Sequence, residues 1–269
     1  MRKISANYIY PVTSNPIKNG ILVLDDDNRI VDVIDTQGKI KEIQNLEFYS
    51  GIITPGFIDV FTLLSWSSFN KEDITECFAA DFTTILKEKM NGLSTDPHSI
   101  QRGINHLEAF GTKGAADFLP DQQGKESKQR SKVLFRDVNF TNFSLNLQIP
   151  GTRESNFSND PILLNRISIK NLNQPDPNNF KRYCVGSGSL ATHQKLSVFE
   201  ELKQIQTKFL NQSVWELIKW ASINPATYLA LCDDLGSLEI VKKPGLNLLS
   251  KIDLQNQRLA SDSELRVLI

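Results

Sequence analysis

Histidine is scarce in this chain of 269 residues. Its three histidines are His98, His106 and His193, and none of them forms an H-x-H, H-x-x-E or H-E-x-x-H pair. Such spacings place two metal ligands on one face of a strand or helix. The sequence therefore contains no histidine-based metal motif, and each of the three is expected to be an ordinary solvated or hydrogen-bonded side chain.

Cysteine and long apolar runs are also scarce. Cys77, Cys184 and Cys232 are odd in number and widely spaced, which excludes a disulfide framework or a zinc knuckle and predicts buried thiols. No segment approaches the ~20 apolar residues of a membrane helix, and no apolar stretch follows Arg2 and Lys3 as a signal peptide requires. We therefore expect no membrane partner and a cytoplasmic location.

An excess of one charge is absent as well. The net charge is −1, and the lysines and arginines are scattered. A nucleic-acid-binding domain would show clustered cations. We expect no nucleic-acid partner and, with 40 % hydrophobic residues, one large globular domain or two modest ones.

The apolar pattern predicts an α/β protein. Residues 4–49 read as short strands separated by turns such as Asn19-Gly20, whereas residues 57–64 form the nearly continuous apolar run of a strand buried on both faces. Strand candidates recur later in the chain; they are Ala115–Phe118, Val133–Phe135, Ile162–Ile169, Leu235–Ile240, Leu246–Leu249 and Leu265–Ile269. The fold class expected is α/β.

Four helices are expected between the strands, one of which has Val214, Leu217, Ile218 and Ala221 on its apolar face. Ile100, Ile104, Leu107 and Phe110 follow helical spacing, as do Leu196, Phe199, Leu202 and Ile205 in a helix from about Lys195 to Leu210. Glu200-Glu201 is assigned to the solvated side of that second helix. Asn224-Pro225 resembles an N-cap followed by proline at the first helical position.

Four segments, in order, resemble motifs of the amidohydrolase superfamily. Residues 53–59 (ITPGFID) are similar to the segment that leads into barrel strand 1, and residues 110–118 (FGTKGAADF) to strand 2. Residues 185–192 (VGSGSLAT) are similar to the "GTDSxAS" turn after the last barrel strand. Residues 224–249 resemble the "NPA…LGSLEVGKDADLVLL" return. Residues 186–202 favour the branch of cyclic-amidine deaminases that includes aminodeoxyfutalosine deaminase.

The resemblance implies an incomplete (β/α) TIM-like barrel plus a small β-sandwich subdomain built from both chain ends. The implied division is 1–50 and 234–269 for the composite β subdomain and 51–233 for the barrel. That barrel span is shorter than the ~200 residues a complete barrel rarely falls below. An incomplete barrel leaves strand edges uncovered, so we expect a homodimer or a loop that plugs the gap.

The departures from the family motifs fall on its metal ligands. The family, which would use zinc or iron, places two histidines where this chain has Phe61 and Leu63, and an aspartate where it has Gly188. None of these three vestigial positions can ligate a metal. We therefore expect no metal or other cofactor and no catalytic residue, and expect Phe61 and Leu63 to be buried among apolar neighbours.

Other chemistry at the same turn has weaker support. Ser187 or Ser189 with His193 could suggest a serine nucleophile, but the G-x-S-x-G elbow is not matched. The backbone N–H groups of Gly186, Ser187 and Ser189 could instead hold an anion ahead of a helix. For Asp59 a structural role is expected.

Two functions follow from the resemblance. The first is a metal-free, catalytically inactive pseudoenzyme, either a binding or scaffold protein or a decaying paralogue. The alternative is an active amidohydrolase or deaminase that acts on C–N bonds, other than peptide bonds, of a nucleoside-like or cyclic amidine substrate. The missing metal-binding side chains favour the first function. The sequence does not identify a small molecule that the protein binds under either function.

Overall fold

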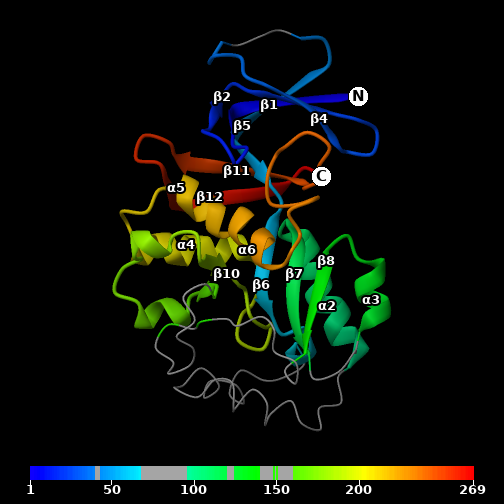
Figure 1. Cartoon of the computed structure of the whole chain (residues 1–269), viewed down its shortest axis with the longest axis vertical. Helices are drawn as coiled ribbons and strands as arrows, with labels where there is room; N and C mark the ends of the chain where they lie inside the picture. Colours follow the sequence, from blue (N-terminus) through cyan, green and yellow to red (C-terminus); the bar gives the residue numbers. More distant parts are fainter. Residues whose placement is uncertain (40–42, 68–95, 120–123, 140–147, 149, 151–159) are drawn as a thin grey trace.

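The structure is a computed structural model that describes residues 1–39, 43–67, 96–119, 124–139, 148, 150 and 160–269. Two β-structures divide it: a large sheet that contains both chain ends, and a smaller set of parallel strands covered by helices (Figure 1). Cys77 lies outside the described residues. In the described part no helix is long and apolar enough to cross a membrane.

The large sheet joins strands from both ends of the chain. Its members are β1 (Arg2–Ile9), β2 (Ile17–Lys18), β3 (Ile21–Leu24), β4 (Ile30–Ile34), β5 (Leu46–Pro55), β11 (Leu246–Asp253) and β12 (Arg258–Val267). The order is β12-β11-β5-β1-β3-β4, with β2 on β1. The junction between the two ends is the antiparallel pair β5–β11, in which Ile53 faces Leu248.

This sheet has an apolar core of its own. Ile4, Leu22, Ile53 and Leu248 belong to one buried cluster, which pulls strands from both ends together. The strands predicted near 246–249 and 265–269 exist and are longer than predicted. The division at 50 and 234 and the sandwich form of the β subdomain stay predictions, and β5 runs past the first boundary to Pro55.

The parallel strands form an arc. Its members are β6 (Phe57–Thr62), β7 (Thr112–Leu119), β8 (Leu134–Asn139), β9 (Ile162–Leu164) and β10 (Tyr183–Val185). β6-β7-β8 and β9-β10 are separate ladders. A parallel bridge from Thr62 to Gly188 joins them, with Gly188 N–H donating to Phe61 O at 2.9 Å. The strand order is therefore β9-β10-β6-β7-β8, and no closed barrel is detected within the described ranges.

Helices cover the arc, and three of the α-helices begin at a residue whose side chain caps them. They are α2 (Pro97–Ala109), α3 (Lys125–Arg130), α4 (Val198–Lys208), α5 (Val214–Trp220) and α6 (Ile223–Tyr228), with 3-10 turns η1 (Leu64–Trp66), η5 (Ser168–Asn171) and η6 (Pro177–Asn179). Asp96 caps α2 by accepting from His98 N–H at 3.1 Å, and Ser197 caps α4. The predicted helices are confirmed, although α4 starts three residues after Lys195.

The two faces of the arc carry different cover. Ala115 of β7 packs with Ile104 and Leu107 of α2 on one face. On the other face Ala116 and Phe118 cluster with residues of α6 and the segment that follows it, 229–235. Arg136 of β8 ties that segment down, because its Nε and Nη2 both donate, at 3.1 Å each, to the carbonyls of Leu229 and Ala230. This face is therefore filled by the chain itself.

Three local predictions are wrong. The N-cap of α6 is Ser222 and not Asn224, whose side-chain amide instead donates to Phe180 O at 2.7 Å and Tyr183 O at 2.9 Å. The strand expected from Ile162 ends at Leu164, because Asn165 accepts two backbone N–H groups and forms a turn. Residues 235–240 form turns and bends, with Gly236 in the left-handed region at φ +86°.

Candidate functional site

Phe61 and Leu63 lie at the carboxyl end of β6, where the family places its first two metal ligands. Both side chains are fully buried in the apolar cluster of the filled face, together with Leu163 and Cys184. The Phe61 ring lies 4.9 Å from that of Phe118, centroid to centroid, in a tilted contact. The predicted burial of Phe61 and Leu63 is confirmed. Dispersion contacts replace ligand atoms at both positions.

Gly188 lies opposite, immediately after β10. It adopts φ +75°, and its carbonyl accepts from Leu63 N–H at 2.9 Å. A Cβ at this position would contact the ring of His193, with its nearest atom at 3.4 Å. Position 188 is thus a backbone junction between β6 and the turn after β10, and it supplies no carboxylate.

In the turn predicted to hold an anion, the side chain of Asp59 occupies the groups of Ser187, and the anion site itself stays a prediction. Ser187 N–H donates to Oδ1 of Asp59 at 3.0 Å and its hydroxyl to Oδ2 at 2.5 Å. Gly186 N–H donates to Leu164 O, and Gly188 N–H to Phe61 O. Ser189 uses its hydroxyl to accept from Ala191 N–H at 3.2 Å. The N–H groups of residues 186–188 are therefore satisfied internally.

Asp59 joins β6 to the turn after β10. Its carboxyl group is fully buried and also accepts from Phe61 N–H at 3.1 Å. Burial raises the pKa of Asp59 to about 7, although the hydrogen bonds from Ser187 and Phe61 favour the charged form. The expected structural role fits this geometry, because the bonds from Ser187 hold β6 against the turn after β10.

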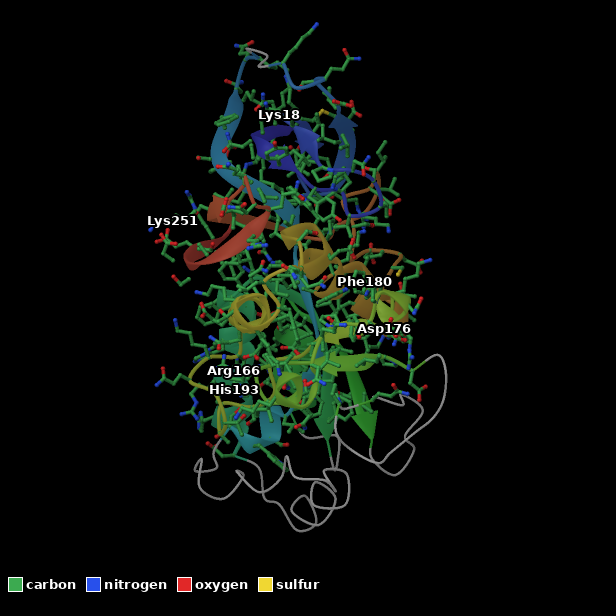
Figure 2. All side chains as sticks on the ribbon, turned by 90° about the vertical axis from the view of Figure 1, so that its left-hand side faces the viewer. Lys18, Arg166, Asp176, Phe180, His193 and Lys251 are labelled. Carbon is green, nitrogen blue, oxygen red and sulfur yellow. The ribbon has the colours of Figure 1, made fainter. Side chains whose placement is uncertain are left out.

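Glu201 was wrongly assigned to a solvated helix face. Its side chain is fully buried and binds Arg166, whose backbone N–H donates to Oε2 at 2.6 Å and whose Nε donates to Oε1 at 2.7 Å. His193 Nε2 lies 3.7 Å from Oε1, and Figure 2 shows Arg166 and His193 close together. Burial raises the pKa of Glu201, and Arg166 opposes the shift.

The sequence carried a signal for this burial. Val198, Glu201, Leu202 and Ile205 are spaced at i, i+3, i+4 and i+7, so Glu201 shares the apolar stripe of α4. A single acidic residue on such a stripe is polar and buried, and it then needs a cationic or hydrogen-bonding partner. Arg166 lies in a segment that has no periodic pattern, and sequence spacing could not pair the two.

The three histidines are not gathered into a site. His193 is buried, and its Nδ1 lies 2.6 Å from the Thr192 hydroxyl, so it is hydrogen-bonded as expected. His98 is exposed at the start of α2. His106, also on α2, contacts the Phe110 ring, and burial lowers its pKa.

A second buried ionic group lies beside α3 and was not predicted. Lys128, only 4 % exposed, reaches Asp117 Oδ2 at 2.6 Å and Asp137 Oδ1 at 2.5 Å. The two aspartates face each other in the parallel register of β7 and β8. Asp117 also accepts from Leu64 N–H at 3.0 Å, and burial raises its pKa against the pull of Lys128. The group fastens α3 to the arc.

The residues at the family's ligand positions do not fit a metal ion. Two are hydrocarbon, the third is glycine, and the nearby buried carboxylates are held by Ser187, Arg166 and Lys128. Among the residues that the structure describes, no group of three or more His, Cys, Asp or Glu side chains is arranged to hold a metal. The geometry of these described positions supports packing and ionic cross-links.

An arc of parallel strands, covered by helices and attached to a sheet made from both chain ends, is a fold similar to that of several solved deaminases. The resemblance to the amidohydrolase superfamily that the motifs indicated is confirmed at the level of fold. No family model and no curated protein matches the sequence.

Individual solved structures show the same similarity. Aminofutalosine deaminase from Helicobacter pylori, in complex with methylthio-coformycin, aligns with a TM-score of 0.60 at 13% identity, over 93% of this chain and 92% of that chain. The 5-methylcytosine deaminase from Klebsiella pneumoniae aligns with a TM-score of 0.59 at 10% identity, over 92% and 91%. A zinc-bound adenosine deaminase from Xanthomonas campestris aligns with a TM-score of 0.52 at 13% identity, over 96% and 86%.

Proposed function

We propose that this protein is an amidohydrolase-like pseudoenzyme, which has the deaminase fold without metal-dependent hydrolysis and serves as a binding or scaffold protein. One observation carries the proposal: Phe61 and Leu63 occupy the first two ligand positions and are fully buried in an apolar cluster. The deaminase structures, one of which contains zinc, support the fold on which those positions are defined.

The physical argument concerns the nucleophile. A hydrolase of this class uses its metal to lower the pKa of bound water toward ~7, and a carboxylate then moves the proton. A divalent ion beside Phe61 would lose its hydration shell and gain no ligand in return, and burial of an unpaired charge is strongly unfavourable. Gly188 offers no carboxylate from the opposite strand. Both the hydroxide and the proton carrier are therefore missing at these positions.

Metal analysis together with activity assays tests this proposal. The protein is purified without chelator, its zinc, iron and nickel are quantified, and deamination of adenosine and 5-fluorocytosine is followed. We expect metal far below one equivalent and no turnover above the buffer blank. Phe61→Leu, which also lacks a donor atom, is the matched control and should behave identically. Stoichiometric metal lost in a Gly188 or Phe61 variant, or metal-dependent turnover, would establish the active-enzyme alternative instead.

A ligand-restoring variant gives a second readout. Phe61→His, Leu63→His and Gly188→Asp together return three donors to the family positions. Turnover should still be absent, because the family needs further histidines on middle strands and the chain's three lie elsewhere. Zinc uptake by the triple variant with turnover would show that the rest of the catalytic site is intact.

Assembly and location complete the proposal. The described arc ends at β8 on one side, and unpaired edges of parallel strands favour association. We propose a homodimer, or a segment of the chain that covers the gap, in a cytoplasmic protein without nucleic-acid or membrane partners. Light scattering coupled to size exclusion checks the mass, and a monodisperse monomer would leave only the covering segment.

A further inference from the structure

A pocket of about 600 Å³ lies at the end of the arc opposite to Phe61 and Leu63. It opens where β7 and β8 begin and extends to the turn before β4 and the turn before β11. Its lining residues are Asn28, Arg29, Lys113, Lys132, Leu134, Asp234, Leu235, Lys243, Gly245 and Ile269. We name it the lysine pocket, after Lys113, Lys132 and Lys243. Its volume is in the range typical of small-molecule sites, ~300–1,000 Å³.

Two glycines make room for Lys113. A Cβ at Gly56 would lie 2.2 Å from Cγ of Lys113, and a Cβ at Gly245 would lie 2.5 Å from its Cε. Gly245 also has φ +68°, which favours glycine. The aliphatic stem of Lys113 is therefore held between two backbone segments, and its ammonium group is placed at the pocket by packing. A freely moving surface lysine would need no such space.

Four cationic side chains line the lysine pocket, against one acidic side chain, Asp234. Arg29 lies 3.8 Å from Asp234, but Lys113, Lys132 and Lys243 make no ion pair with any carboxylate that the structure describes. Burial lowers the pKa of Lys113, and the nearby charge of Lys132 lowers it further. Glu108 opposes this shift, but the lining as a whole has more positive than negative side chains, an excess that an anion would relieve.

The pocket also has an apolar wall. Leu134 is 46% exposed at the first position of β8, and Leu235 and Ile269 line the same opening. We propose that the lysine pocket binds a small molecule that carries a phosphate group beside an apolar body, as in an aryl phosphate monoester. Lysines supply charge-assisted hydrogen bonds to the phosphate oxygens, and the leucines cover the apolar part. This inference does not depend on the absence of catalysis.

Isothermal titration calorimetry of the full chain with phenyl phosphate, inorganic phosphate and phenol tests the inference. Phenyl phosphate should bind most tightly, inorganic phosphate more weakly, and phenol not measurably. Affinity should fall as sodium chloride is raised, because salt screens the partly exposed lysines. If inorganic phosphate binds as tightly as phenyl phosphate, the apolar part of the proposal is wrong. Absence of heat with all three ligands at millimolar concentration overturns it entirely.

Matched variants separate the pocket from general charge. Lys113→Met keeps the stem and removes the charge, and should weaken phenyl phosphate binding by roughly 10- to 100-fold, as expected for one charged hydrogen bond. Lys181→Met removes an exposed lysine elsewhere and should leave binding unchanged. Lys132→Met with Lys243→Met changes only exposed side chains, and serves if Lys113→Met fails to fold. Equal loss in the pocket variants and Lys181→Met would contradict the site.

Discussion

The two ends of the parallel arc differ in whether their charged side chains have partners within the chain. At the carboxyl end, where the deaminase family holds its metal, Asp59 and Glu201 are fully buried, each bound by groups of the chain itself. At the amino end, Lys113 and its neighbours Lys132 and Lys243 have no ion-pair partner among the described carboxylates. The carboxyl end resembles a protein core, whereas the amino end presents the charges that a ligand would need.

On the proposal above, the ligand-binding site lies at the opposite end of the arc from the position where the deaminase family holds its metal. A buried charge whose partners are all internal stabilises one arrangement and has nothing left for a ligand. An unpaired charge at a pocket contributes little to folding and is available for recognition. Fold similarity alone would place a binding site at the carboxyl end, whereas the side chains favour one at the amino end.

Truncation at Phe61, where the family places a metal ligand, should have the largest effect on stability. Phe61→Ala removes a fully buried ring that packs on Phe118, and should lower the free energy of unfolding by about 3–5 kcal/mol. Phe48→Ala, at a phenylalanine that is 51% exposed, should change it by less than about 0.5 kcal/mol. Urea denaturation checks both. A neutral Phe61→Ala would mean that this end is open and could admit a ligand.

Removal of a buried acid should come next. Glu201→Ala leaves the Nε and the backbone N–H of Arg166 without their acceptor, and should cost about 3 kcal/mol in urea denaturation. Its neighbour Glu200 pairs with Lys203 near the surface, so Glu200→Ala should cost below about 1 kcal/mol. Similar losses of unfolding free energy in the two variants would contradict the conclusion that the carboxyl end is packed like a protein core.

The pH dependence of stability tests Asp59. Its pKa is about 7 in the folded protein against an ordinary 3.8, so between these values the folded state retains a proton that the unfolded state has lost. Stability should therefore fall as pH rises through this window, by at most about 1.4 kcal/mol per pH unit from this group. Asp59→Asn preserves the shape and cannot titrate, so its profile should be flatter. Parallel profiles from pH 4 to 7 would contradict the assignment.

At the amino end the expected stability change is the smallest and has the opposite sign. Lys113→Met removes a partly buried cation that repels Lys132, and retains the stem between Gly56 and Gly245. Thermal unfolding should show no loss, or a gain of up to about 1 kcal/mol. A loss comparable to that of Glu201→Ala would mean that Lys113 has an internal partner and that the lysine pocket is structural.

Periodicity and motif order predicted the elements that carry a strong local pattern. The apolar run at β6, the stripe of α2 and the junction motifs near β10 were all readable, because their burial follows strand or helix periods. The partners of buried charges were not readable. Lys128 meets Asp117 and Asp137 only because β7, β8 and α3 come together in space, and no spacing in the chain records that meeting.

The lysine pocket was unreadable for the same reason. Lys113, Lys132 and Lys243 come from three separate segments, and in the sequence they are ordinary members of a scattered set of cations. Gly56 and Gly245 each follow a proline, and in the sequence such a pair marks only a turn. Only the packed structure shows that their missing side chains are filled by a lysine stem.

The pairing of β5 with β11 has a consequence for the order of folding. Ile52 and Ile53 take Leu249 and Leu248 as strand partners, so that edge of β5 is complete only when segments almost two hundred residues apart meet. During synthesis the apolar edge of β5 therefore stays unpaired until nearly the whole chain has been made. Long-range pairing of this kind slows folding and leaves the edge open to other chains. Premature termination before β11 should then yield aggregates rather than a smaller folded protein.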